Sequence, residues 1–214
     1  MSRWRTLHFE FGAMASSCSL QLDGKDERVM RRAASLVIAE VHRIESKFSR
    51  YLDSSVVSRI NRNAGLASIE VDPETDGLLD FAERLWKLSD GLFDITSGVL
   101  RRAWDFKNAL VPEEDELQPL LELVGWSEVE RQGNRVRLRV PGMELDFGGF
   151  GKEYAADRAA AILLGHGIEH ALVNLGGDLH ALGARGLPEQ YGSPWHIGIQ
   201  HPRPQPAQPF EDIA

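Results

Sequence analysis

The sequence predicts an α+β fold in which a mixed or antiparallel sheet is flanked by helices. Short segments with alternating polar and apolar residues predict strands, and longer segments with apolar residues three or four positions apart predict helices. The two kinds of segment do not alternate regularly, as they would in a doubly wound parallel sheet. With 214 residues, the chain can bury one substantial core or two small lobes.

The first half of the chain is predicted to hold a hairpin and two helices. Residues 6–22 form two short strands with Gly12 between them, and Asp26 begins a long helix. A second helix begins at Asp72-Pro73, because Asp can cap a helix and Pro suits its first turn, and Gly91 lies just past its end. The apolar residues expected in the core are Val29, Ala33, Leu36, Val37, Val41, Ile44 and Phe48 in the first helix and Leu78, Leu79, Ala82, Leu85, Trp86 and Leu88 in the second.

Shorter elements are predicted in the second half. The strand at residues 135–140 is expected to pair with residues 143–147 across Pro141-Gly142. The other expected elements are a short helix at residues 113–124 that Pro119 limits or kinks, an alanine-rich helix at residues 152–164 that ends at Gly165, strands at Ala171–Leu175 and residues 195–199, and a proline-rich loop or linker at residues 201–209.

Composition and charge exclude several classes of protein. The net charge of −8 argues against general nucleic-acid binding, which depends on Lys and Arg that neutralise phosphates. A single cysteine, Cys18, excludes an internal disulfide framework and argues against a Cys-rich zinc site. No stretch approaches the roughly 20 apolar residues that span a bilayer. No export signal is visible at the N-terminus, so we expect a cytoplasmic protein.

The run DFGGFGKEYAAD at residues 146–157 is the strongest functional signal in the sequence. Its glycines allow a sharp turn from a strand into a helix, where free N–H groups and Lys152 could hold an anion. Asp146 could accept a hydrogen bond from a ribose or a ring N–H, or help to hold a cation. The alternative is a glycine-rich turn that serves packing alone. The run is neither a Walker loop, since no Ser or Thr follows Lys152, nor a GxGxxG fingerprint.

Three further segments could contribute to the same site. Residues 174–178 read Asn-Leu-Gly-Gly-Asp, which indicates either a second strand end that converges on a ligand or a tight hairpin. Residues 91–98 could offer free main-chain groups to a planar ring, but the segment judged alone favours an ordinary connection with Phe93 in the core. Tyr51 follows the first long helix, where its ring could stack on a flavin or a base or simply pack. The histidines fit no metal-binding spacing.

Taken in order, these segments resemble the ApbE family, the FAD:protein FMN transferases. The resemblance runs over residues 11–202 and is most specific in the blocks FSRYLDSSVVSRIN, GLFDITSGVLRRAW, DFGGFGKEYAADRA and VNLGGDLHALG. It implies a T-fold-like core that binds FAD with Mg²⁺. It also implies cleavage of the FAD pyrophosphate, transfer of FMN to a Thr or Ser hydroxyl of an acceptor flavoprotein, and release of AMP.

The same resemblance implies a role for each matching residue. Tyr51 would stack on the flavin, and the main-chain carbonyl of Gly149 would be one metal ligand. The other FAD contacts that it implies are Leu92, Phe93, Asp94, Asp146 and Lys152. Phosphoryl transfer suits such residues, because it needs charge stabilisation more than covalent catalysis.

In the family, a later segment carries a Thr-Ser-Gly stretch, a His-x-x-Asp-Pro motif and an Asp/Thr pair that ligates the metal. We therefore expect residues 1–201 to be the N-terminal two-thirds of a transferase domain, with residues 202–214 as a Pro-rich linker or truncated end. A C-terminal half or partner chain would complete the site, and little activity is expected from this chain alone. The alternatives are a non-catalytic FAD-binding protein and a Mg²⁺-dependent FAD pyrophosphatase.

Overall fold

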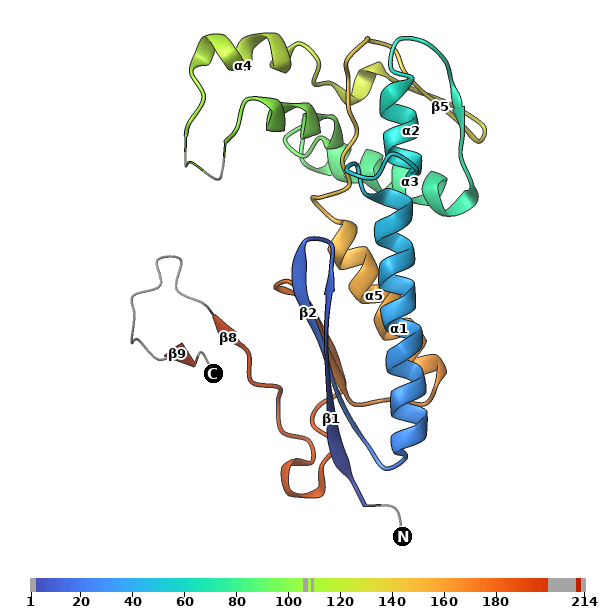
Figure 1. Cartoon of the computed structure of the whole chain (residues 1–214), viewed down its shortest axis with the longest axis vertical. Helices are drawn as coiled ribbons and strands as arrows, with labels where there is room; N and C mark the ends of the chain where they lie inside the picture. Colours follow the sequence, from blue (N-terminus) through green and yellow to red (C-terminus); the bar gives the residue numbers. More distant parts are fainter. Residues whose placement is uncertain (1–2, 106–107, 109, 200–210, 213–214) are drawn as a thin grey trace. The chain divides into compact units, whose positions relative to one another are not determined.

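The computed structural model describes residues 3–105, 108, 110–199 and 211–212 (Figure 1). The predicted proline-rich segment at residues 201–209 lies outside them. The α-helices are α1 (Glu27–Phe48), α2 (Val56–Arg62), α3 (Pro73–Leu88), α4 (Glu114–Leu121) and α5 (Gly151–Gly165). The strands are β1 (Arg5–Ala13), β2 (Ser16–Gly24), β3 (Ile69–Glu70), β4 (Val129–Gln132), β5 (Arg135–Leu138), β6 (Ala171–Leu175), β7 (Asp178–Leu182), β8 (Gly198–Ile199) and β9 (Glu211–Asp212).

The chain folds into two compact units. The first contains residues 1–42 and 152–214, and the second contains residues 43–151. The second unit is therefore an insertion in sequence between two parts of the first. No helix in the described part of the chain is both long enough and apolar enough to cross a membrane.

The first unit contains an antiparallel sheet in the order β1-β2-β6-β7. Apolar residues of β2 lie directly opposite apolar residues of β6, so one face of the sheet is buried. The buried pairs are Cys18 with Leu175, Leu20 with Val173, and Leu22 with Ala171. Figure 1 shows α1 running beside β1 and β2. The α+β class with antiparallel strands is thus confirmed.

The N-terminal hairpin turns at a different place from the one predicted. Gly12 lies inside β1, opposite Ser17, and the turn is made by Met14 and Ala15 with φ angles of 51° and 54°. Two residues with positive φ match the right-handed twist of the flanking strands. The sequence prediction favoured glycine at the turn because glycine enters this region without strain.

The long helix α1 has a slightly different buried face from the one predicted. Met30 is fully buried, whereas Val29 and Leu36 are 36% and 40% exposed. Met30, Ala33, Val37, Val41, Ile44 and Phe48 follow helical spacing and form the buried stripe. Val29 and Leu36 fall at the edges of this stripe.

The second unit contains a small antiparallel sheet in the order β3-β5-β4. Its strand β5 pairs with β4 and β3, and residues 143–147 form no strand, so the predicted pairing across Pro141-Gly142 is wrong. The hairpin turn is instead Gly133-Asn134, where Gly133 has a φ of 57°. The prediction placed the turn after β5, at Pro141-Gly142, whereas the turn that forms precedes it.

The start of α3 follows the prediction. The side chain of Asp72 accepts a hydrogen bond from Thr75 N at 3.0 Å, and Pro73 occupies the first turn. Leu88, predicted to be in the core, is 83% exposed. Helix α4 contains Pro119 and ends two residues after it, and only Gly198–Ile199 of residues 195–199 is a strand.

Candidate functional site

The segment that leads into the glycine-rich run is extended but is held by side chains and loops rather than by a sheet. Leu145 exchanges hydrogen bonds with the Asn61 side chain at 2.8 and 3.0 Å. The Asp146 N–H donates to the carbonyl of Ile95 at 2.9 Å. Met143, Leu145 and Phe147 are buried in alternation. The alternation of buried and less buried residues expected for a strand is therefore present, but Asp146 lies on an extended segment that is not part of a sheet.

The glycine-rich turn uses several of its own N–H groups. Phe150 N and Gly151 N both donate to the carbonyl of Phe147, at 3.1 and 2.6 Å, and Gly148 N donates to the Asp146 carboxylate at 3.0 Å. Of these three donors only Gly151 N belongs to the start of α5, so the turn itself uses one of the N–H groups that were expected to remain free for an anion. The Phe150 ring is buried against Phe81 and Phe147, with centroids at 5.2 and 5.4 Å.

A 3₁₀ helix, η1 (Ile95–Arg102), lies beside this turn. Asp94 caps it, since one carboxylate oxygen accepts from Thr96 N and Oγ1 at 2.8 and 2.7 Å. Its other oxygen accepts from Trp126 N at 2.8 Å. The Asp94 side chain therefore has a structural role, although Asp94 still lines the hollow described next.

The second unit contains a hollow of about 310 Å³ between η1 and the glycine-rich turn. Five of the seven residues predicted to bind FAD or metal line it, namely Leu92, Phe93, Asp94, Asp146 and Gly149. Such a volume lies at the lower end of ligand pockets, which span roughly 300–1,000 Å³. The structure thus brings together residues from two separate segments of the chain.

Phe93 and Gly149 meet at the wall of this hollow. A Cβ atom added at Gly149 would lie 2.9 Å from Cε2 and Cζ of the Phe93 ring. Real side chains do not approach so closely, so glycine at this position lets the ring pack on the main chain. Leu92, one residue earlier, is 93% exposed.

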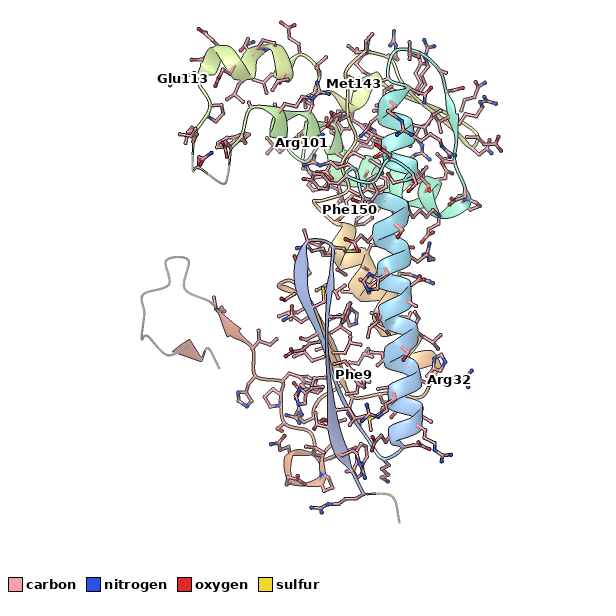
Figure 2. The ribbon with its side chains drawn as sticks, in the orientation of Figure 1. Phe9, Arg32, Arg101, Glu113, Met143 and Phe150 are labelled. Carbon is pink, nitrogen blue, oxygen red and sulfur yellow. The ribbon has the colours of Figure 1, made fainter. Side chains whose placement is uncertain are left out.

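Three residues of the hollow received no predicted role: Arg50, Arg101 and Trp104. Arg50 forms an ion pair with Asp146, with Nη1 2.9 Å from Oδ2. Arg101, labelled in Figure 2, lies on η1. Arg50 and Arg101 belong to blocks singled out by sequence, but the roles of such long side chains depend on which segments the fold brings near them.

Tyr51 lies beside the hollow without lining it. The residue is 73% exposed, and the centroid of its ring lies 5.2 Å from the Arg50 guanidinium and 5.8 Å from that of Arg101. One face or edge of the ring is therefore available to solvent. An exposed tyrosine ring held by two cations is a suitable surface for stacking.

Lys152 follows the glycine-rich turn directly and belongs to the first unit. Its Nζ lies 3.9 Å from Asp178 Oδ2, and the side chain is 30% exposed. Asp178 begins β7, after a two-residue turn at Gly176-Gly177 with φ angles of 69° and 103°. The hairpin interpretation of residues 174–178 is therefore the observed one, and its turn lies near Lys152.

The described residues include no group of three or more His, Cys, Asp or Glu side chains that could hold a metal ion. The Asp146 carboxylate, which the sequence suggested could help to hold a cation, forms an ion pair with Arg50 and accepts a hydrogen bond from Gly148 N. These residues therefore do not form a complete magnesium site.

A larger hollow of about 470 Å³ lies in the first unit and is lined in part by Trp4, His170 and Tyr191. None of the predicted site residues lines it. We therefore take the smaller hollow, where five of them converge, as the candidate site.

The family model described as ApbE matches residues 14–214. The chain belongs to the ApbE family. Every residue that lines the candidate hollow falls within the ApbE match.

Individual ApbE proteins agree with this result. An FAD:protein FMN transferase from Klebsiella pneumoniae (strain 342) is 31% identical over 94% of this chain and 61% of its own length. One from Treponema pallidum (strain Nichols) is 31% identical over 74% of this chain and 47% of its own length. The crystal structure of the ApbE protein from Thermotoga maritima matches 98% of this chain and 68% of that chain, with a TM-score of 0.82 and 30% identity. The chain thus spans about half to three-fifths of these curated relatives.

Proposed function

We propose that this chain takes part in transferring FMN from FAD to a Thr or Ser hydroxyl of an acceptor flavoprotein, with release of AMP. The observation that carries the proposal is the convergence of Leu92, Phe93, Asp94, Asp146 and Gly149 around one hollow. The relatives named FAD:protein FMN transferases support the same reaction.

In this reaction the acceptor hydroxyl oxygen forms a bond to the FMN phosphorus of FAD. The bond from that phosphorus to the bridging pyrophosphate oxygen breaks, and AMP leaves with the bridging oxygen and both electrons of the bond. The hydroxyl proton is released. No covalent intermediate with the protein is needed, so the protein has to orient FAD and offset its charge.

The residues of this chain have separate proposed roles. Tyr51 stacks on the flavin ring, because its ring is exposed and held beside the hollow. Leu92, Phe93 and Asp94 contact the flavin from the segment just before η1, and Asp146 accepts a hydrogen bond from FAD. Lys152 offsets phosphate charge.

Magnesium is proposed only in part. The main-chain carbonyl of Gly149 is one candidate ligand, since Mg²⁺ prefers oxygen donors and usually bridges substrate phosphates. Because the described residues do not form a complete metal site, no reaction step is assigned to the ion. We propose that the remaining ligands come from residues outside the described part, on a continuation or a partner chain.

The proposal is tested by incubating the chain with FAD, Mg²⁺ and an acceptor protein that presents the target threonine. The reaction is run with and without the C-terminal part of a curated relative. Flavin fluorescence that stays with the acceptor on a denaturing gel, together with an equal amount of AMP, is the expected result. A Thr→Val acceptor is the control and should stay unlabelled.

Three other outcomes would contradict transfer. AMP release without labelling of the acceptor would identify an FAD pyrophosphatase. FAD binding with neither product, even with the added C-terminal part, would identify a non-catalytic FAD-binding protein. No binding of FAD at all would remove the candidate site.

A further inference from the structure

Arg50 is a largely buried cation at the edge of the candidate hollow. Its side chain is 11% exposed, although it lies two residues after the end of α1 and precedes the exposed Tyr51. Removing a guanidinium from water is costly unless partners compensate for the lost hydration. The partners of Arg50 therefore indicate what the side chain is for.

Those partners come from three separate parts of the candidate site. Nη1 lies 2.9 Å from Asp146 Oδ2 and donates to the carbonyl of Gly98 at 3.0 Å. Nη2 donates to the Tyr51 hydroxyl at 3.3 Å. The guanidinium also lies 5.2 Å from the centroid of the Tyr51 ring. A planar fork with several donors can hold such divergent groups at once, which a single ammonium group cannot.

The backbone around Arg50 is fixed as well. Ser58 Oγ donates to the Arg50 carbonyl at 3.0 Å, so the start of α2 holds the residue in place. Gly98 of η1 also packs closely against the Arg50–Asp146 ion pair. A Cβ atom added at Gly98 would lie 2.6 Å from Asp146 Cβ and 3.0 Å from Arg50 Nη1. Close packing of η1 on this ion pair therefore requires glycine at position 98.

The Arg50–Asp146 ion pair also sets the charge of the hollow. An unpaired Asp146 carboxylate would repel an anionic ligand, and Arg50 compensates it within 2.9 Å. The same contact points the carboxylate in one direction and leaves its other oxygen to accept from Gly148 N at 3.0 Å.

We propose that Arg50 is a positioning residue of the flavin site, which orients Tyr51 and Asp146 for the flavin end of FAD. The inference rests on the proposed function, because it assumes that FAD is the ligand. Arg50 acts through its neighbours. It holds the Tyr51 ring, which stacks on the flavin, and the Asp146 carboxylate, which accepts a hydrogen bond from FAD. Helix η1 packs against the Arg50–Asp146 pair.

The test compares Arg50→Gln with the wild-type chain in titrations of FAD, riboflavin and AMP, followed by flavin fluorescence or calorimetry. We expect the dissociation constants for FAD and riboflavin to rise by about tenfold or more in parallel, while that for AMP stays unchanged. The matched control is Arg62→Gln, because Arg62 is 55% exposed and pairs with a fully exposed Asp53 at 3.4 Å. The control should change each constant less than about twofold.

A second variant keeps the test sharp if Arg50→Gln folds poorly. Arg50→Lys keeps the charge but loses the fork, so we expect an intermediate rise of about threefold for FAD and riboflavin. Adding Asp146→Asn to Arg50→Gln removes the uncompensated carboxylate and should recover part of the lost affinity. Circular dichroism and thermal melting check the fold of each variant.

Each remaining outcome overturns the inference in a distinct way. Weaker binding of AMP with unchanged binding of riboflavin would make Arg50 a direct phosphate ligand. Unchanged affinity in Arg50→Gln, with binding by the wild-type chain, would leave Arg50 a purely structural residue. If the wild-type chain bound neither FAD nor riboflavin, the proposed function would fail first, and Arg50 would have no flavin to position.

Discussion

At the scale of single residues, close contacts of the main chain shape the candidate hollow. Gly98 and Gly149 lie where a Cβ atom would collide with Asp146 and with the Phe93 ring, at 2.6 and 2.9 Å. Neither glycine has a positive φ, so space and not backbone conformation requires them. Adding one carbon at either position therefore changes the walls of the hollow.

Gly149→Ala should weaken FAD binding by about tenfold, equivalent to roughly 1.4 kcal/mol. The new methyl group would meet Cε2 and Cζ of the Phe93 ring and displace it. Because this ring lines the hollow, its displacement changes the shape of the site. Flavin fluorescence quenching measures the effect. An affinity equal to that of the wild-type chain would show that this turn is not part of the site.

Lys152→Ala should also weaken FAD binding by about tenfold, because the lysine offsets phosphate charge. Its ion pair with Asp178 is long, at 3.9 Å, so little thermal stability should be lost. Lys87→Ala, which removes an exposed lysine paired with Glu83, is the control. Equal affinities for wild type and Lys152→Ala would remove this residue from the site.

At the scale of elements, the sequence predicted correctly those features that depend on residues close together in the chain. The cap at Asp72, the helix to Gly165 and the strand Ala171–Leu175 each depend on residues a few positions apart. The segment at residues 143–147 could not be predicted in this way. Its alternation suits a strand, but its partners include Asn61, which is 84 positions from Leu145 in sequence.

The same distinction applies to the site. Leu92, Phe93, Asp94, Asp146 and Gly149 lie in sequence blocks that could be recognised, and the structure gathers them at one hollow. The engagement of the Asp94 carboxylate by Trp126 N, 32 positions away, could not be predicted from either block. Nor could the pairing of Arg50 with Asp146, because it exists only once two distant segments meet.

Helix α3 offers a test that is independent of any ligand. Gly77 lies inside this helix, is exposed, and has no heavy atom within 4 Å of an added Cβ. Gly77→Ala should raise the free energy of unfolding by about 0.5–1 kcal/mol, because alanine loses less backbone entropy on helix formation. Urea unfolding measures it, and a lower midpoint would contradict the helix environment described here.

At the scale of the whole molecule, the chain returns after residue 151 to complete a unit that it began at its N-terminus. Asp23 fastens the two parts of this first unit. It is buried, with 2% exposure, and accepts from Arg185 Nε at 2.8 Å, Thr6 Oγ1 at 2.6 Å and Gly186 N at 2.9 Å. Burial works to raise the pKa of Asp23, but these hydrogen bonds and the Arg185 charge outweigh it and hold the pKa below its ordinary value of 3.8.

A lowered pKa in the folded state makes stability depend on pH in one direction. The contribution of Asp23 is fully present above its unfolded pKa near 3.8 and is lost as pH falls through the lower folded pKa. Asp23→Asn should therefore reduce the acid dependence of unfolding and cost about 3 kcal/mol at pH 7, because Arg185 is left buried without a counter-charge.

Urea unfolding between pH 2 and pH 7 measures both effects, with Asp53→Asn as the control at a fully exposed carboxylate. The control should keep the acid dependence of the wild-type chain. An Asp23→Asn variant with the same acid dependence as wild type would contradict the role assigned to this carboxylate.

Hydrogen exchange of the full chain with and without FAD tests most directly whether the hollow beside η1 is the flavin site. FAD should slow exchange in residues 92–98 and 146–151, where the predicted contacts converge. Unchanged exchange in both segments, or protection confined to the hollow lined by Trp4, His170 and Tyr191, would contradict the account.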